Sequence, residues 1–323
     1  MGRTQRARLR GRTAAARSTR LSQGRGALAE ARAQAFFRGG ASRCRCGWPQ
    51  LLRLLGLLAV ATLVASVLLA NRGAHAGAWT LPAGRGQAIV TGTFQKADRY
   101  FDAQGRTIRG PDYRKFEATA FIEYGLTDSL TAILSPSLLS TRVAGPAPAD
   151  YTGLGYTEIG GRYRIVDRDG WIVSVQAIAA FPGPTNPLNP AEVCCTDKYA
   201  DARLLIGKSF MLGRWPSFVD AQAAYRLRAG AASDEVRLDL TFGIRPLPQW
   251  LFLAQSFNVL ATNGLAGGGL LGLLSGTRYH KVQVGAVWDF ADNWSLQVAG
   301  VATLQGKNAP LERGLVSGLW YRF

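Results

Sequence analysis

The chain has 323 residues, 47% of them hydrophobic, and a formal net charge of +17, so it is long enough for one large domain or two. The charge could indicate nucleic-acid binding, but residues 1–76 hold 14 of the 38 basic residues and one acidic residue, Glu30. The remainder is close to neutral, and the basic segment lacks interleaved aromatic residues, so no nucleic-acid partner is predicted.

Residues 1–47 are rich in Ala, Arg and Gly and show no hydrophobic periodicity. A segment of this composition cannot bury enough apolar surface to fold, so we predict a disordered basic leader. Two origins remain open for it. It is either an extended leader or translated sequence upstream of the true start.

Residues 48–76 have the pattern of a secretory signal peptide. The apolar run 51–70 is preceded by Arg43 and Arg45 and followed by Ala74-His75-Ala76. A basic region, an apolar region and an A-x-A site predict cleavage between Ala76 and Gly77. The apolar run is long for a signal peptide, so an uncleaved membrane anchor is the alternative.

From residue 77 to residue 323 the polarity alternates with a period of two, which is typical of β-strands. In 234–245, for example, Val236, Leu238 and Leu240 share one face, and Arg237 and Asp239 share the other. The pattern predicts twelve strands, at 87–98, 115–124, 130–141, 155–166, 171–182, 198–211, 217–228, 234–245, 250–262, 277–290, 294–305 and 310–323.

The predicted connections are of two kinds. Those after even-numbered strands are short turns, whereas most of those after odd-numbered strands are longer, at 102–114, 143–154, 183–197 and 263–276. An even number of strands with short turns at one end and longer loops at the other is typical of a transmembrane barrel. We therefore predict an all-β fold, a single antiparallel transmembrane β-barrel of about 12 strands. A soluble barrel is disfavoured because aromatic residues gather at the strand ends.

The last strand has an apolar face formed by Leu315, Leu319, Tyr321 and Phe323. It resembles the closing strand of bacterial outer-membrane barrels, which typically ends in Phe. The resemblance implies that Leu319, Tyr321 and Phe323 are an insertion signal read by the barrel assembly machinery. The apolar face is expected to contact outer-membrane lipid.

The opposite faces of the strands are expected to line the lumen. They hold nine acidic and nine basic residues, so no preference for anions or cations is predicted. Two roles remain open, an ion-pair lattice that stiffens the barrel and a polar conduit for solutes. The residues are Glu117, Glu123, Glu158, Asp201, Asp220, Glu235, Asp239, Asp289, Glu312, Arg162, Arg164, Arg203, Arg226, Arg228, Arg237, Arg245, Lys281 and Arg322.

Two loops carry unusual residues. Loop 263–276 is rich in Gly and Leu and uncharged, and it could form an apolar mouth, fold inward as a plug or extend the neighbouring strands. Loop 183–197 contains Cys194 and Cys195, which outside the cytoplasm are expected to oxidise to a disulfide that clips the loop.

No motif predicts catalysis, a cofactor or a metal site. After signal cleavage the remaining histidine is His280, which the alternation places on the outer face, and the nearby Ser275 lies in no nucleophile-elbow motif. We therefore predict that the protein is not an enzyme. A lipid-modifying barrel enzyme remains the least favoured alternative.

One turn carries a resemblance to a known family. The sequence YGLTDSL at 124–130, followed by Pro136, resembles the repeated turn of the outer-membrane barrels of the phenol meta-pathway (MetA-pathway) family, and 246–251 and 292–296 look like variants of it. The resemblance implies an outer-membrane channel or transporter for passive uptake of small hydrophobic or aromatic solutes. The alternative is a structural barrel with a plugged lumen.

Overall fold

A computed structural model describes residues 77–145, 148–184, 191, 197–229, 233–262 and 277–323. This part of the chain is all-β, and none of its residues forms a helix long and apolar enough to cross a membrane. The strands are β1 (Gly86–Phe101), β2 (Thr107–Thr127), β3 (Leu130–Val143), β4 (Ala149–Arg168), β5 (Trp171–Pro182), β6 (Tyr199–Leu212), β7 (Trp215–Arg228), β8 (Glu235–Leu247), β9 (Trp250–Ala261), β10 (Arg278–Ala291), β11 (Trp294–Lys307), β12 (Ala309–Pro310) and β13 (Arg313–Arg322).

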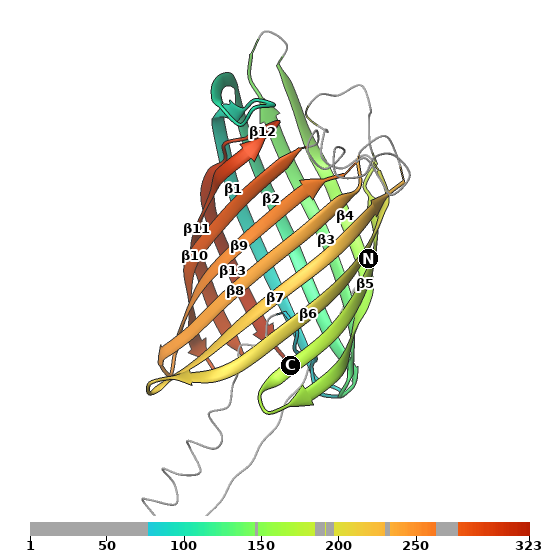
Figure 1. Cartoon of the computed structure of the whole chain (residues 1–323), viewed down its shortest axis with the longest axis vertical. Helices are drawn as coiled ribbons and strands as arrows, with labels where there is room; N and C mark the ends of the chain where they lie inside the picture. Colours follow the sequence, from blue (N-terminus) through green and yellow to red (C-terminus); the bar gives the residue numbers. More distant parts are fainter. Residues whose placement is uncertain (1–76, 146–147, 185–190, 192–196, 230–232, 263–276) are drawn as a thin grey trace, which may run out of the picture. The chain divides into compact units, whose positions relative to one another are not determined.

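The strands form one closed antiparallel barrel (Figure 1). Strands β2 to β10 each pair with their neighbours in the sequence, β11 pairs with β10, and β13 pairs with both β11 and β1. Strand β12 has two residues and pairs only with the end of β1, so the wall consists of twelve long strands. The predicted fold class, strand number and antiparallel closure are confirmed.

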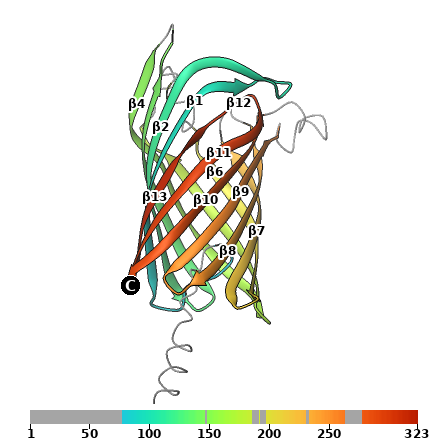
Figure 2. The same ribbon diagram turned by 90° about the vertical axis from the view of Figure 1, so that its left-hand side faces the viewer.

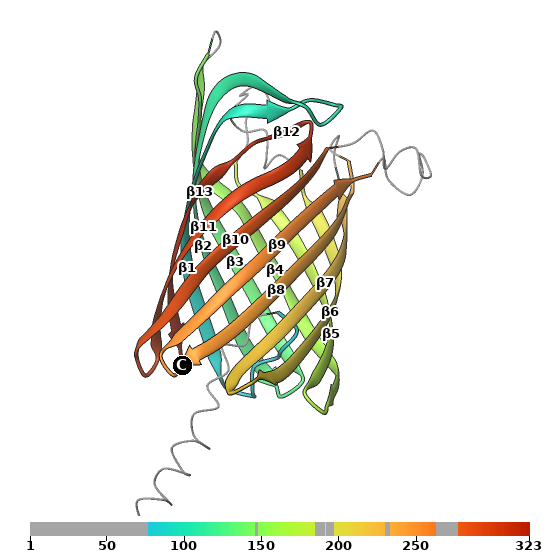
Figure 3. The ribbon, with the colours of Figure 1, turned by 60° about the vertical axis from the view of Figure 1, so that its left-hand side comes forward.

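Two predicted loops are wrong, because most of their residues continue the strands. Strand β2 begins at Thr107 and β4 begins at Ala149, inside the predicted loops 102–114 and 143–154. Figures 2 and 3 show that the β1–β2 hairpin extends beyond the barrel wall and bends over its end. Polar residues in these hairpins weaken the apolar alternation, but the backbone still pairs, as Arg99 with Arg109. We call this end the hairpin end and the opposite one the turn end.

The exterior of the wall is apolar. Val284 and Leu315 are 65% and 66% exposed, and large apolar side chains from every long strand share this surface. At the turn end the exterior aromatic rings stack, as Trp250 does on Trp288. A continuous apolar surface of this size with an aromatic girdle is the lipid-facing surface of a transmembrane barrel, not of a soluble one.

Strands β1 and β13 close the barrel. Ten residue pairs join them, from Gln87–Arg322 to Lys96–Arg313. Beyond the Gln87–Arg322 pair, Gly86 and Phe323 exchange two backbone hydrogen bonds of 2.8 and 2.9 Å. A Cβ atom on Gly86 would lie 2.2 Å from the phenyl ring, so glycine there lets the ring of Phe323 rest on the β1 backbone.

Deleting Phe323 is expected to lower the amount of folded barrel, because the seam then loses both hydrogen bonds and the aromatic contact to Tyr321. The heat-modifiable band on a gel of isolated outer membranes measures this amount. Phe290→Ala is the matched control, since Phe290 and Phe323 are both 45% exposed on the exterior but Phe290 is not at the seam. Equal folded levels in the deletion and the control would contradict the expectation.

Candidate functional site

Residues Gly77–Arg85 precede β1 and lie inside the barrel at its turn end; we call them the N-terminal segment. The backbone N–H of Ala78 donates to Oδ2 of Asp220 at 2.7 Å, and the hydroxyl of Ser174 donates to the carbonyl of Ala78 at 2.6 Å. Further along, the N–H of Leu81 donates to the hydroxyl of Thr131 at 2.9 Å. These partners come from strands β7, β5 and β3, so the segment is held by several parts of the wall.

Apolar contacts fix the same segment. Ala78 is fully buried in a cluster with Ile172 and Leu205, and the ring of Trp79 packs against this cluster. The Trp79 ring also meets Phe218 edge-on, with centroids 5.5 Å apart. The sequence did not predict this arrangement, because a segment of nine residues has no periodicity and its partners lie far away in the chain.

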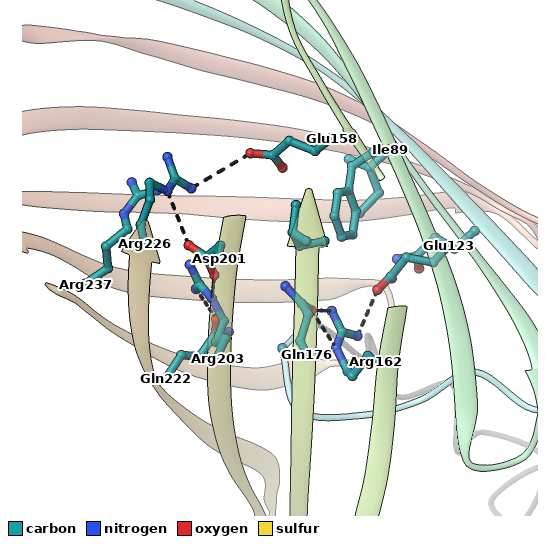
Figure 4. Close-up of a pocket in the computed structure, with 14 residues that line it drawn as sticks. Ile89, Glu123, Glu158, Arg162, Gln176, Asp201, Arg203, Gln222, Arg226 and Arg237 are labelled. Atoms are coloured by element: carbon teal, nitrogen blue, oxygen red, sulfur yellow. Dashed lines mark hydrogen bonds and ion pairs between the residues drawn. The ribbon is translucent and has the colours of Figure 1, made fainter. Parts of the chain in front are cut away.

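Arg162 of β4 joins the N-terminal segment to the wall. Its guanidinium donates to Glu123 of β2 at 2.8 Å, to Gln176 of β5 at 2.9 and 3.1 Å, and to the carbonyl of Trp79 at 2.9 Å. Arg162 and Glu123 are 4% and 3% exposed. Figure 4 shows Arg162 between the two partner side chains. A buried charge pair of this kind is held in place by its additional hydrogen bonds.

A second network lies on the neighbouring strands (Figure 4). Asp201 of β6 accepts from Arg226 of β7 at 3.3 Å and from Arg203 at 3.4 Å. Arg203 also pairs with Asp239 at 2.8 Å, and Arg226 reaches Glu158 of β4 at 3.9 Å, although β5 and β6 lie between their strands. These contacts link strands β4, β6, β7 and β8 along the interior wall.

The other predicted lumen residues form smaller groups. Arg245 and Arg322 both pair with Asp289, at 2.6 and 3.7 Å, near the turn end. Further pairs join Arg228 and Arg237 to Glu235, Lys281 to Glu312 and Lys115 to Glu117. Arg164 lies near a turn and pairs with Asp167, a residue that the prediction did not include. Eight of the nine predicted acidic residues thus have a basic side chain within 4.0 Å.

Asp220 is the ninth acidic residue and differs from the others. It is 1% exposed, and within the described ranges no basic side chain lies within 4.0 Å of its carboxylate. Its two oxygens accept hydrogen bonds from the Ala78 N–H and from the side-chain amide of Gln222, the latter at 2.5 Å.

Three adjoining cavities run along the interior. The upper cavity, of about 380 Å³ near the hairpin end, is lined mainly by apolar atoms and by Tyr100, Tyr113 and Tyr279. The middle cavity, of about 330 Å³, shares Lys115 and Tyr279 with it. The lower cavity, of about 270 Å³, shares Glu158, Arg226 and Arg237 with the middle one and reaches Gly77. The sequence offered no signal for the upper cavity, since its tyrosines come from separate strands.

Several predicted features lie outside the described residues. These are the leader 1–47, the signal segment 48–76 with Ala76, the cysteines Cys194 and Cys195, and loop 263–276 with Ser275. His280 is described, and its ring contacts the side chain of Asn258. Within the described ranges no group of three or more His, Cys, Asp or Glu residues could hold a metal ion.

Comparison with solved structures identifies the class of the fold. An outer membrane channel from Pseudomonas putida F1 superimposes with a TM-score of 0.59 at 18% identity, over 76% of this chain and 98% of that one. The NanC porin gives a TM-score of 0.45 at 10% identity, over 72% of this chain and 98% of that one. The first likeness shows that this chain has the barrel fold of an outer-membrane channel.

No protein-family model matches the chain, and no curated protein matches it. The resemblance to the phenol meta-pathway family therefore stays a prediction.

Proposed function

We propose that the protein is an outer-membrane channel for passive uptake of small hydrophobic or aromatic solutes. The observation that carries this proposal is the run of three adjoining cavities, which begins in an apolar, tyrosine-lined cavity at the hairpin end. Aromatic rings offer flat apolar faces on which a solute ring can stack. The polar networks below would then conduct a small solute towards the N-terminal segment.

The proposed location follows from the surface of the barrel and from the sequence. The apolar exterior suits lipid, and closed barrels satisfy every strand edge within a membrane. We propose export through the signal peptide with cleavage between Ala76 and Gly77, followed by insertion guided by the closing strand with Leu319, Tyr321 and Phe323. The likeness in fold to an outer membrane channel supports this location.

The function is tested with purified barrel in planar lipid bilayers. We expect ion conductance, and we expect p-nitrophenol on the hairpin side to reduce the current reversibly by occupying the upper cavity. Tyr279→Ser should weaken this block, because its ring lines that cavity. Tyr163→Ser is the matched control, since its ring lies on the exterior. Absence of conductance together with absence of solute flux into liposomes would refute the channel.

A structural barrel that transports nothing is the second candidate. It is favoured by the N-terminal segment, which lies inside the turn end, and by the ion-pair networks, which hold the wall together. The same bilayer experiment separates the two candidates. A lipid-modifying enzyme is not proposed. The ring of His280 contacts Asn258, whose amide also donates to the hydroxyl of Ser256 at 3.0 Å, but the described residues show no hydrogen bond between Ser256 and His280.

A further inference from the structure

The carboxylate of Asp220 is buried, and no basic side chain lies within 4.0 Å of it among the residues that the structure describes. Transfer of an ionised carboxylate out of water costs several kcal/mol unless a positive charge accompanies it. The two hydrogen bonds from Ala78 and Gln222 satisfy the oxygens but bring no charge. Every other acidic residue of the predicted lumen has such a partner within 4.0 Å.

Gly77 lies directly against this carboxylate. A Cβ atom built on Gly77 would lie 2.2 Å from Cγ and 2.3 Å from both carboxylate oxygens of Asp220. The backbone at Gly77 has a φ of 86°, which also favours glycine. The nitrogen of Gly77 is one covalent bond, about 1.46 Å, from the same Cα atom. It is therefore close to the carboxylate oxygens.

We propose that removal of the signal peptide supplies the missing charge, and that Asp220 is the binding site for the new N-terminus. Water adds across the Ala76–Gly77 peptide bond, Ala76 leaves with the carboxylate, and the nitrogen of Gly77 becomes an ammonium group. The single N–H of the peptide becomes three donors and a positive charge next to Asp220. Cleavage thereby completes the anchoring of the N-terminal segment inside the barrel.

This inference rests on the proposed cleavage position but not on transport. It assigns a role to Asp220, the one acidic residue of the predicted lumen that has no basic side chain within 4.0 Å among the described residues. In an uncleaved chain the same position offers an uncharged peptide nitrogen, so the N-terminal segment supplies no ion pair to Asp220 there.

The test measures the reactivity of the N-terminal amine. The full chain is expressed with its leader, the barrel is purified from outer membranes, and mass spectrometry follows reductive methylation of the Gly77 amine. Lys208, whose side chain lies at an exterior turn, serves as the internal reference. We expect the amine of the native barrel to react at least about ten-fold more slowly than in the unfolded chain, because methylation requires local opening.

Asp220→Asn retains an acceptor for Ala78 but removes the charge, and it should raise the rate towards the unfolded value. Gly77→Ala should do the same, because its Cβ atom displaces the carboxylate, and it keeps the inference testable if the first variant fails to fold. Glu312→Gln is the matched control, since Glu312 is a buried carboxylate that pairs with Lys281 near the hairpin end and should leave the rate unchanged. An N-terminus other than Gly77, or equal rates in native barrel and Asp220→Asn, would overturn the inference. Neither result depends on whether the barrel conducts.

Discussion

Replacing residues 79–83 with a Gly/Ser sequence of equal length is expected to raise the single-channel conductance several-fold. The replacement removes the Trp79 ring, which packs against the Ala78 cluster and Phe218, and the side-chain hydrogen bond from Thr80 to the backbone of Asp128. These are the contacts that hold the segment across the turn end. Without them the segment no longer blocks the path below the lower cavity.

The replacement leaves Gly77 and Ala78 in place, so the cleavage site keeps its residues. The control is a Gly/Ser replacement of residues 103–105, an exposed turn between β1 and β2 at the hairpin end. Conductance in planar bilayers and swelling of proteoliposomes report the change. If both variants conduct like the native barrel, the N-terminal segment does not limit the conductance of the channel.

Arg162→Ala is expected to destabilise the barrel by about 3–5 kcal/mol, because it leaves Glu123 buried without its partner. The same change removes the hydrogen bond to the Trp79 carbonyl, so it should also loosen the N-terminal segment. The urea dependence of unfolding, followed by tryptophan fluorescence in detergent micelles, gives the free energy. Adding Glu123→Gln to the Arg162→Ala variant should recover part of the loss, because the buried charge is then gone.

Arg106→Ala is the control for this experiment. Arg106 pairs with Asp102 at 2.9 Å, but it is largely exposed in the β1–β2 turn, where water screens the pair. We expect little change in unfolding there. A similarly small loss in Arg162→Ala would show that the interior charges are hydrated in the folded barrel.

The strand pattern was predictable because the barrel wall imposes a period of two on every strand. In 234–245 the residues predicted to face outward include Leu238 and Leu240, and both are exposed on the exterior. The predicted strands were too short at β2 and β4, where the hairpins extend beyond the predicted strand ends. There the side chains no longer alternate between lipid and lumen, so only backbone pairing defines the strand.

The sequence by itself determined an all-β barrel, the number of its strands and the direction of its faces. Each of these depends on local alternation and on turn spacing. Only the tertiary structure decided which interior charges form ion pairs and that Asp220 has no such partner within 4.0 Å among the described residues. It also decided that the N-terminal segment lies against these interior side chains. Those contacts join residues as far apart as Ala78 and Asp220, and the curvature of the closed barrel, which no local pattern encodes, brings them together.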